Sequence, residues 1–377
     1  MKNNRTFLDK LLDGAKVKWK PLGMVANLTR GRVMSKEYLS ENRGSYSVYS
    51  SQTANNGEIG KINSFDFEGE FVSWTTDGAN AGTVFYRSGK FSITNVCGLI
   101  TINNTLELNY KFLFYWLSIE AQKHVYSGMG NPKLMSHQME KIQIPIPPLS
   151  VQTEIVRILD ALTALTSELT SELTSELILR QKQYGYYREK LLSFDSLERL
   201  NEGGAKKKLI DVCINIFSGK NKERNDNGLY PIYGSTGIIG KTNNKEFSNE
   251  QILVARVGAN AGYVHIAKGE YDVSDNTLIV QNNEQVHTKF LYHILVNMKL
   301  NQYAKGAGQP LITAGQLKSM EIFIPLLEEQ HRIVSILDKF ETLTNSITEG
   351  LPLAIEQSQK RYEYYRELLL SFPKLDN

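Results

Sequence analysis

An internal duplication constrains the fold of this chain more than any other feature of its sequence. Residues 157–160 read RILD and residues 335–338 read SILD, while residues 184–189 read YGYYRE and residues 362–367 read YEYYRE. Both matches have the same separation of 178 residues. A fixed period means that one structural unit occurs twice. The 377 residues are therefore expected to form two similar halves, each large enough for its own core.

The regions outside these helical matches repeat as well. Residues 78–82 read GANAG and recur unchanged at 258–262, and the IPIP of residues 144–147 has its counterpart in the IFIP of residues 322–325. Between such anchors the two blocks diverge widely. The two blocks are therefore expected to share one backbone fold and to differ in their surface side chains.

Each block is predicted to mix strands and helices, which makes the fold class α+β. In the first block, β-rich runs at 46–50, 70–75, 82–87 and 97–102 are separated by Asn and Gly turn signals. Apolar residues at helical spacing between 112 and 117 then predict a helix.

The stretch from Thr163 to Leu177 contains three tandem Thr-Ser-Glu-Leu units and neither Gly nor Pro. It is predicted to be one uninterrupted helix. Four residues advance a helix by about 6 Å and turn it about 40° beyond one full turn, so the repeat would act as a ruler. An ordinary amphipathic packing helix is the alternative. The leucines expected to form a seam along this spacer helix are Leu165, Leu169, Leu173 and Leu177.

The order block, helix, block, helix predicts two α/β domains related by a pseudo-twofold axis. Two long antiparallel helices of about 45 residues, roughly 65 Å each, would join them as a coiled-coil-like spacer. Gly350 and Pro352 predict a kink or break in the second helix. The expected limits are 1–150 and 201–326 for the domains, and 151–200 and 327–377 for the helices.

Charge is distributed unevenly along the chain. Basic residues exceed acidic ones by 5 in residues 1–150 and by 3 in residues 201–325. Acidic residues exceed basic ones by 2 in residues 151–200 and by 3 in residues 326–377. This direction suits two polyanion-binding modules on a neutral-to-acidic frame, although a random scatter of charge remains an alternative.

Two basic modules at a fixed separation are typical of DNA-binding proteins that read two half-sites along one duplex. Arg, Lys, Asn and Gln in the loops suit base edges and phosphates, and solvated loops or strand-connecting turns are the competing interpretation. We align Arg30, Arg32 and Lys36 roughly with Lys220, Lys222 and Arg224 in the second block. The candidate DNA-contacting residues are Arg30, Arg32, Lys36, Gln52, Asn55, Asn56, Asn80, Asn131, Lys133, Lys220, Lys222, Arg224, Ser235, Thr236, Arg256, Asn260 and Gln309.

Tyrosine and arginine concentrate at the end of each long helix, a composition typical of protein interfaces. Part of this surface is expected to pack internally, and the rest is a candidate docking surface for protein partners. Its residues are Tyr184, Tyr187, Arg188, Tyr362, Tyr365 and Arg366.

Signatures of catalysis are weak. The Gly237–Thr242 segment lacks the first glycine of a phosphate-binding loop, since Ser235 stands at that position. Neither Cys97 and Cys213 nor the six histidines have metal-ligand spacing in the sequence. No residue is predicted to be catalytic, no metal is expected, and a cytoplasmic location is the default.

The TSEL array behind Ile155–Asp160, the two YYRE helix ends and residues 344–352 together resemble the specificity subunit of type I restriction–modification enzymes, type IC branch. The resemblance covers the whole chain and is most specific in the helical regions. It implies two target-recognition domains, each reading one half of a bipartite, asymmetric DNA sequence, with the tetrapeptide repeats setting the gap.

The same resemblance implies that the chain is a non-catalytic DNA-recognition subunit without cofactors of its own. Two methyltransferase (modification) subunits and ATP-using restriction subunits would bind it, and the assembled complex would use S-adenosylmethionine, ATP and Mg²⁺. A coiled-coil protein scaffold, or a stand-alone DNA-binding regulator without methyltransferase partners, is the alternative.

Overall fold

The computed structural model describes residues 6–127, 130–200, 203–225, 227–306, 308–346 and 348–373. Gly128, Met129 and Ala307, which belong to a repeated glycine-rich motif, lie outside the described residues. The chain divides into two compact units, Met1–Ser171 with Glu356–Asn377, and Glu172–Ile355. Each unit contains one sheet-based domain and about half of each helical segment.

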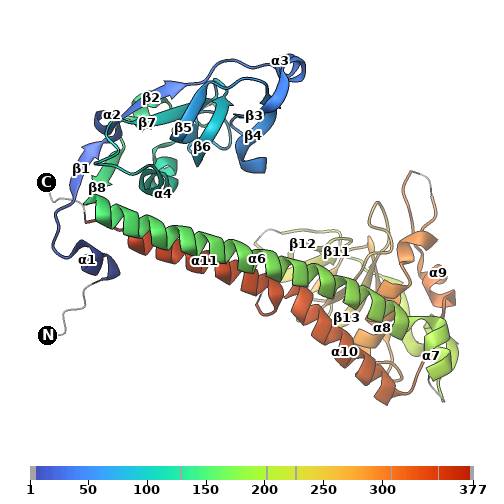
Figure 1. Cartoon of the computed structure of the whole chain (residues 1–377). Coiled ribbons are helices and arrows are strands. Elements are labelled where there is room, and N and C mark those ends of the chain that lie inside the picture. The colour runs from blue at the N-terminus through green and yellow to red at the C-terminus, as the bar shows by residue number, and fades with distance from the viewer. Residues whose placement is uncertain are drawn as a thin grey trace. The chain divides into compact units, whose positions relative to one another are not determined.

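The first unit is built on a six-stranded sheet whose strand order is β2-β7-β5-β6-β3-β4 (Figure 1). Its strands are antiparallel except for β3 and β6, which are parallel. The four β-rich runs predicted from the sequence of the first block all lie in or beside these strands. The bounds are β2 Ala26–Arg30, β3 Arg43–Tyr49, β4 Glu58–Ile62, β5 Phe67–Thr75, β6 Val84–Ile93 and β7 Cys97–Ile102.

Helix α4 (Tyr110–Glu120) lies between this sheet and the long helix α6 (Leu149–Leu192), as Figure 1 shows. Trp74 and Ile100 from the sheet, Phe112 from α4 and Leu159 from α6 belong to one buried core, which is why the domain is held on the helix. A separate two-stranded ladder pairs β1 (Lys18–Pro21) with β8 (Gln143–Ile146). The short helices are α1 Phe7–Leu12, α2 Leu22–Val25, α3 Lys36–Glu41, η1 Ala54–Gly57, η2 Ala121–His124 and α5 Ser136–Met139.

The second unit repeats this plan with smaller sheets. A four-stranded sheet has the order β10-β16-β13-β14, a three-stranded sheet has the order β12-β11-β15, and β9 pairs with β17. The bounds are β9 Ala205–Lys208, β10 Cys213–Ser218, β11 Tyr230–Gly234, β12 Gly237–Thr242, β13 Gln251–Ala255, β14 Val264–Ala267, β15 Asp272–Val273, β16 Thr277–Asn282 and β17 Glu321–Ile324.

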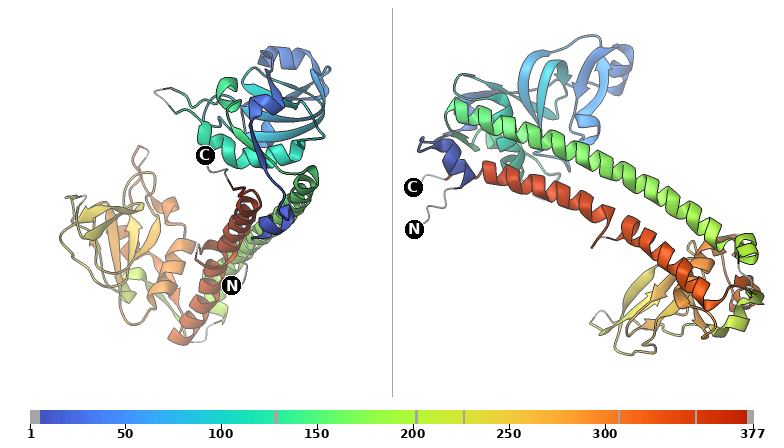
Figure 2. Two further views of the ribbon diagram at one scale, coloured as in Figure 1. Left: turned by 90° about the vertical axis from the view of Figure 1, so that its left-hand side faces the viewer. Right: turned by 60° about the horizontal axis from the view of Figure 1, so that its bottom comes forward.

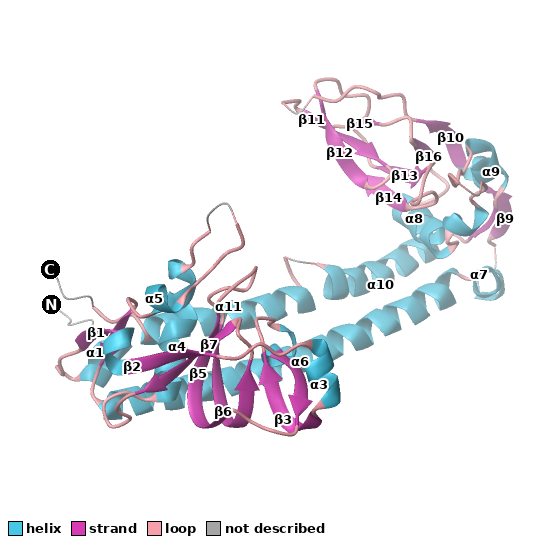
Figure 3. Cartoon of the chain, turned by 90° about the horizontal axis from the view of Figure 1, so that it is seen from above, coloured by secondary structure: helices cyan, strands magenta, loops and turns pink. Residues whose placement is uncertain are grey.

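Helix α8 (Thr288–Asn297) occupies the place that α4 has in the first unit, between the sheet and the helix α10 (Leu327–Asn345), as Figure 3 shows. Ile252 and Val280 from strands, Phe290 from α8 and Leu337 from α10 share one core. The remaining short helices are α7 Phe194–Leu200, η3 Leu209–Val212, η4 Leu300–Tyr303 and α9 Ala314–Ser319.

The predicted uninterrupted helix through the TSEL repeats is confirmed. Helix α6 has 44 residues and its only glycine, Gly185, meets no atom within 4 Å of an added Cβ. In the first unit its chain direction is opposite to that of α11 (Leu351–Leu369), and the hydroxyl oxygens of Thr163 and Tyr362 lie 3.1 Å apart. In the second unit the Tyr187 ring stacks on Phe340 of α10 at a centroid distance of 5.7 Å.

The second helical segment is broken, as Gly350 and Pro352 predict. Two helices of 19 residues each, α10 and α11, replace the single helix expected over 327–377 (Figure 2, right). Gly350 adopts φ +89°, and an added Cβ there would lie 2.6 Å from the Thr342 carbonyl oxygen. Pro352 is the second residue of α11, where a missing N–H costs no helical hydrogen bond.

Both domains are joined to their helix by the same buried glutamine. The Gln152 side chain accepts from the Asn109 N–H at 2.9 Å and donates to the carbonyl oxygens of Glu107 and Pro147. In the second unit, Gln330 makes the corresponding bonds to His287, Gln285 and Pro325. Both glutamines are completely buried, so these bonds offset a large desolvation cost. The duplication is therefore present at the level of single hydrogen bonds.

Among the described residues, no helix is long and apolar enough to cross a membrane.

Candidate nucleic-acid interface

In the first unit, loops that are distant in sequence meet at one end of the sheet. Arg32 forms a backbone bridge with Thr94, whose N–H donates to the Tyr49 carbonyl at 2.9 Å. The Thr76 N–H donates to Val96 at 3.0 Å. The Gly78 N–H likewise donates to the Pro132 carbonyl at 3.0 Å, which adds a further loop to the group. We call this group the first loop face, and it comprises residues 30–36, 50–57, 76–82, 94–96 and 130–135.

The second unit builds an equivalent face with the same backbone bonds. Ser274 donates to the Tyr233 carbonyl at 2.8 Å, and Gly258 donates to the Pro310 carbonyl at 2.9 Å. Arg256 donates to the Asn276 carbonyl, as Thr76 does to Val96. The second loop face comprises residues 219–224, 234–237, 256–262, 274–276 and 308–312. The backbone is shared and the side chains differ, which is the arrangement expected of two readers with different specificities.

Arg30 and Arg32 both lie on the first loop face, and each is paired with a carboxylate. The Arg30 guanidinium is 3.6 Å from Asp77, and the Arg32 guanidinium is 3.0 Å from Asp66. Hydrogen bonds to Tyr38 and Asp66 raise the pKa of Arg32. Both side chains remain about two-fifths exposed, so these pairs orient the guanidinium groups without removing them from solvent. Lys36 is exposed at the start of α3.

Gln52, Asn55 and Asn56 lie on an exposed loop between β3 and β4. Asn55 and Asn56 both adopt left-handed backbone conformations, with φ +50° and +53°. Such a conformation is uncommon outside glycine but is accepted by asparagine. The Gln52 amide donates to the Glu58 carbonyl, which closes the loop on itself.

The buried side chain of Arg87 supports this loop. The sequence analysis predicted only that Arg87 lies in a strand. Its guanidinium is stacked 3.6 Å from the centre of the Tyr49 ring and donates to the Asn56 carbonyl at 2.8 Å and to the Ser73 hydroxyl at 3.0 Å. Only 2% of Arg87 is exposed, and burial lowers its pKa to about 10. The only signal in the sequence was a charged residue within a predicted strand. The structure was needed to show that Arg87 supports the loop that contains Asn56.

The GANAG segments are strand-connecting turns, one between β5 and β6 and one between β13 and β14. Gly78 and Gly82 have φ +90° and +82°, which explains the glycines at both ends. Within the first turn, the Asn80 amide reaches the Ser51 carbonyl at 3.5 Å. Lys133 lies 4.0 Å from Asp77, so it shares this carboxylate with Arg30, and Asn131 is exposed beside it.

The structure shifts the rough alignment of Arg32 with Lys222 by one residue. The bridge that Arg32 makes to Thr94 is made in the second unit by Asn221 to Ser274. The second unit has one additional residue, Lys220, between Gly219 and Asn221. An insertion of one residue cannot be located from the sequence when the residues on either side of the loop do not match between the two blocks. Lys220 and Arg224 are nevertheless exposed on the second loop face, and Lys222 lies 3.9 Å from Asp275.

The other predicted residues of the second unit also lie on this face. Ser235 and Thr236 form the tight turn between β11 and β12, Arg256 follows β13, and Asn260 and Gln309 are exposed in loops. His265, which the sequence analysis did not select, is stacked between Tyr233 and Tyr263 at 6.0 and 5.6 Å. Burial lowers the pKa of His265 to about 4, so the ring is neutral at pH 7.

The predicted leucine seam is wrong for two of its four members. Leu165 is 62% exposed and Leu169 is 38% exposed, whereas Leu173 and Leu177 are half-buried. A four-residue period exceeds the 3.6 residues of a helical turn, so the leucine stripe rotates away from any fixed partner.

The Tyr and Arg residues at the helix ends are divided between internal packing and solvent. The Arg188 guanidinium lies over the Tyr184 ring at 5.4 Å, and Arg366 lies over Tyr362 at 5.6 Å. Tyr187 and Tyr365 are 41% and 43% exposed. Their neighbours Tyr186 and Tyr364 are more exposed still. Each helix end therefore keeps an aromatic surface in solvent.

Comparisons with known proteins agree with this arrangement. The family model for the type I restriction modification DNA specificity domain matches residues 16–178 and again residues 201–357. A Haemophilus influenzae protein assigned as a type I restriction enzyme specificity subunit is 45% identical over 99% of this chain and all of its own. The EcoR124I/EcoR124II specificity subunit of Escherichia coli is 33% identical, and the match covers 98% of both chains.

Solved structures share the fold at low sequence identity. The HsdS subunit of Thermoanaerobacter tengcongensis is 16% identical, with a TM-score of 0.55 over 94% of this chain and 95% of that one. A chain from a structure describing assembly of a type I restriction–modification system gives a TM-score of 0.60 over 94% of this chain and 96% of that one. The two matches of the family model coincide with the two repeated units. The chain therefore belongs to the specificity subunits of type I restriction–modification enzymes and carries two target-recognition domains.

Proposed function

We propose that each loop face reads one half of a bipartite, asymmetric DNA target. The observation that carries this proposal is the shared backbone of the two faces, on which different Arg, Lys, Asn and Gln side chains are displayed. Arg suits guanine edges, Asn and Gln suit adenine edges, and Lys suits phosphate. Residues 1–150 and 201–326 act as the recognition domains and residues 151–200 and 327–377 as the spacer.

The TSEL repeats of α6 set the nonspecific gap between the half-sites. An uninterrupted helix transmits each added tetrapeptide as about 6 Å of length and about 40° of rotation. These values are on the order of one to two base pairs of rise and one of twist. Assignment to the type IC branch is part of this proposal and is supported by the resemblance of the TSEL array.

The chain itself has no catalytic activity and binds no cofactor for the methylation reaction. Two modification subunits dock on the exposed tyrosines of the helix ends, Tyr187 and Tyr365 among them. Restriction subunits join that complex, and S-adenosylmethionine, ATP and Mg²⁺ act in the partners within the cytoplasm.

The test is an exchange of one recognition block. Residues 22–148 are replaced by the corresponding block of a relative with a different target, and methylated adenines are then mapped in cells carrying the hybrid and its modification subunit. Only one half-site should change, while the other half-site and the gap stay the same. A change in both halves would contradict modular recognition. Cells lacking the chain provide the background.

A further inference from the structure

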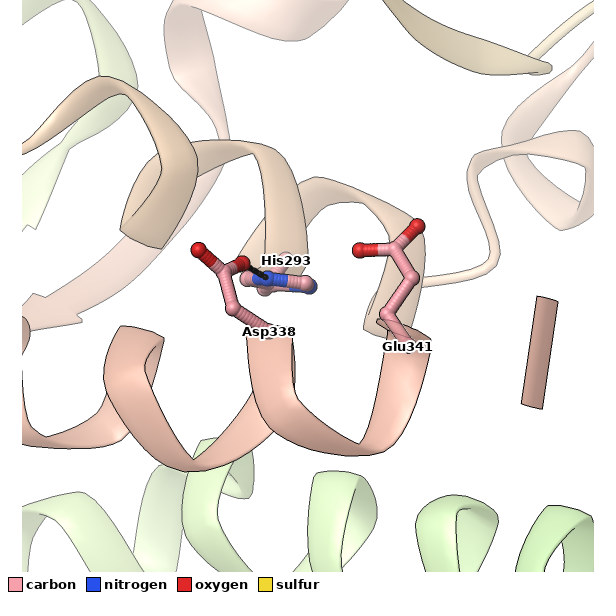
Figure 4. A group of neighbouring side chains, drawn as sticks. All are labelled: His293, Asp338 and Glu341. Atoms are coloured by element: carbon pink, nitrogen blue, oxygen red, sulfur yellow. Dashed lines mark ion pairs between the residues drawn. The ribbon is translucent and has the colours of Figure 1, made fainter. Parts of the chain in front are cut away.

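The duplication places two equivalent polar clusters where each domain meets its long helix. In the first unit the cluster consists of Tyr115 on α4 and of Asp160 and Thr163 on α6. In the second unit, 178 residues further along, it consists of His293 on α8 and of Asp338 and Glu341 on α10 (Figure 4). The two clusters thus have the same position in the fold and different chemistry.

The first cluster satisfies its own polar groups. The Tyr115 hydroxyl donates to Asp160 Oδ1 at 2.7 Å, and the Thr163 hydroxyl donates to the Leu159 carbonyl at 2.7 Å. Lys111 holds the other oxygen of Asp160 at 2.6 Å. No additional group is needed to complete these bonds.

The second cluster does not satisfy its own polar groups. His293 is 1% exposed, and its buried Nε2 has no hydrogen-bond partner among the described residues. The nearest carboxylate oxygen, Asp338 Oδ1, is 3.6 Å away, which is too long for a hydrogen bond. Lys289 binds the other oxygen of Asp338 at 2.5 Å, so Oδ1 faces the imidazole.

The three donors have the separation expected around one small cation. The ligand atoms of His293, Asp338 and Glu341 all lie within 4.8 Å of one another. Two ligands about 2.1 Å from a tetrahedral Zn²⁺ are about 3.4 Å apart, close to the 3.6 Å between His293 Nε2 and Asp338 Oδ1.

We propose that His293, Asp338 and Glu341 bind a divalent transition-metal cation, with Zn²⁺ the best match, which fastens α8 to α10. One imidazole nitrogen and two carboxylates suit Zn²⁺, whereas Mg²⁺ prefers oxygen ligands alone. Lys289 acts as the outer partner that orients the Asp338 carboxylate. The two carboxylates are half-exposed, so a cation can reach the site from solvent.

The test uses the full chain after removal of metals with a chelator. Titration with Zn²⁺, followed by calorimetry and by thermal unfolding, should give one tight equivalent and a raised Tm. Co²⁺ should occupy the same site with a visible absorption band that Zn²⁺ abolishes, and Mg²⁺ should produce neither effect. Absence of a Zn²⁺ equivalent in the intact chain would overturn the proposal.

The first unit supplies the matched variant. The double substitution His293→Tyr with Glu341→Thr copies the cluster of Tyr115 and Thr163, and should lower Zn²⁺ affinity by more than about 100-fold while the chain stays folded. Tyr115→Phe in the first unit should leave Zn²⁺ affinity unchanged. The isosteric Glu341→Gln should weaken binding by at least about tenfold, and it decides the question if the double variant does not fold.

The imidazoles of His287 and His331, with ring centroids 4.8 Å apart, are the competing donors in the same unit. Zn²⁺ binding that persists unchanged in the folded double variant, or in Glu341→Gln, would assign the cation elsewhere and refute the site.

Discussion

At the scale of single residues, buried side chains beneath the loop faces hold the exposed loops in place. Arg87 is the clearest example, because its buried guanidinium holds the carbonyl of Asn56 at the base of an exposed asparagine loop. The left-handed conformation of Asn55 and Asn56 is uncommon and needs such support to persist. The conformation of this exposed loop therefore depends on the buried Arg87 side chain that supports it.

Replacing Arg87 with Met should loosen this loop. The Asn56 carbonyl loses its donor, which costs about 1–3 kcal/mol of stability. Affinity for the first half-site should fall by about tenfold, corresponding to about 1.4 kcal/mol, with no change in preference at the second. Competition binding with DNA altered in one half-site at a time measures both effects. Lys90→Met, on the same strand but with a side chain 41% exposed, is the control, and equal losses in the two variants would contradict the role of Arg87.

The buried histidines make the second unit sensitive to acid. Burial lowers the pKa of His293 to about 4, whereas an unfolded chain has a histidine pKa near 6.5. The unfolded state therefore takes up a proton first, and stability that is complete above about pH 6.5 is lost as pH falls towards 4. The loss for His293 is up to about 3 kcal/mol. His265 acts in the same direction.

Denaturant unfolding from pH 7.5 to 4.5 in a metal-chelating buffer measures this loss. Tyr115, the equivalent residue of the first unit, does not titrate in this range, because burial raises its pKa. His293→Tyr should therefore flatten part of the pH dependence. A pH profile identical to that of the wild type would show that His293 does not contribute.

At the scale of elements, the sequence predicts that a helix or a strand is present better than it predicts which residues that element contacts. Leu165 shows the difference, since the TSEL period specifies a helix correctly but cannot keep four leucines on one side of it. The break at Gly350 was predictable because glycine and proline act on the backbone locally. Side-chain contacts depend on the partner helix, which no local pattern contains.

Deleting residues 170–173 should shorten the tolerated gap without changing either half-site. One tetrapeptide removes about 6 Å and about 40°, on the order of one to two base pairs. Mapping methylated adenines in cells with the deleted and the intact chain measures the gap directly. Four alanines in place of residues 170–173 keep the length, so this control should keep the original gap. A gap that stays fixed in the deletion variant would rule out the ruler.

At the scale of the whole molecule, the duplication allowed most of the fold to be predicted. Two α+β domains and their order follow from a separation of 178 residues, because a repeated sequence implies a repeated structure. For the loop faces, the sequence predicted only which types of residue they would contain. Their members come from five loops per domain, and a single extra residue, Lys220, was enough to displace the alignment. Asp338 and Glu341 likewise lie more than 40 residues from His293.

Because the positive charge is on the recognition blocks, DNA binding by the full chain should weaken steeply with salt. The logarithm of the affinity should fall linearly with the logarithm of the salt concentration, by about 0.9 for each phosphate neutralised. Lys220→Gln, on the second loop face, should reduce this slope by about 1. Lys207→Gln on β9, outside that face, should not. A slope near zero for the intact chain would favour a scaffold that binds only proteins.

The glutamine at each domain junction explains how such a protein can change its target without losing its architecture. Gln152 and Gln330 hold only main-chain groups of the domain, namely one N–H and two carbonyls each. Every amino acid presents a carbonyl, and every amino acid except proline presents an N–H, so mutations in the attached domain leave this attachment intact. Exchange of a whole recognition domain should therefore leave its attachment to the long helix in place.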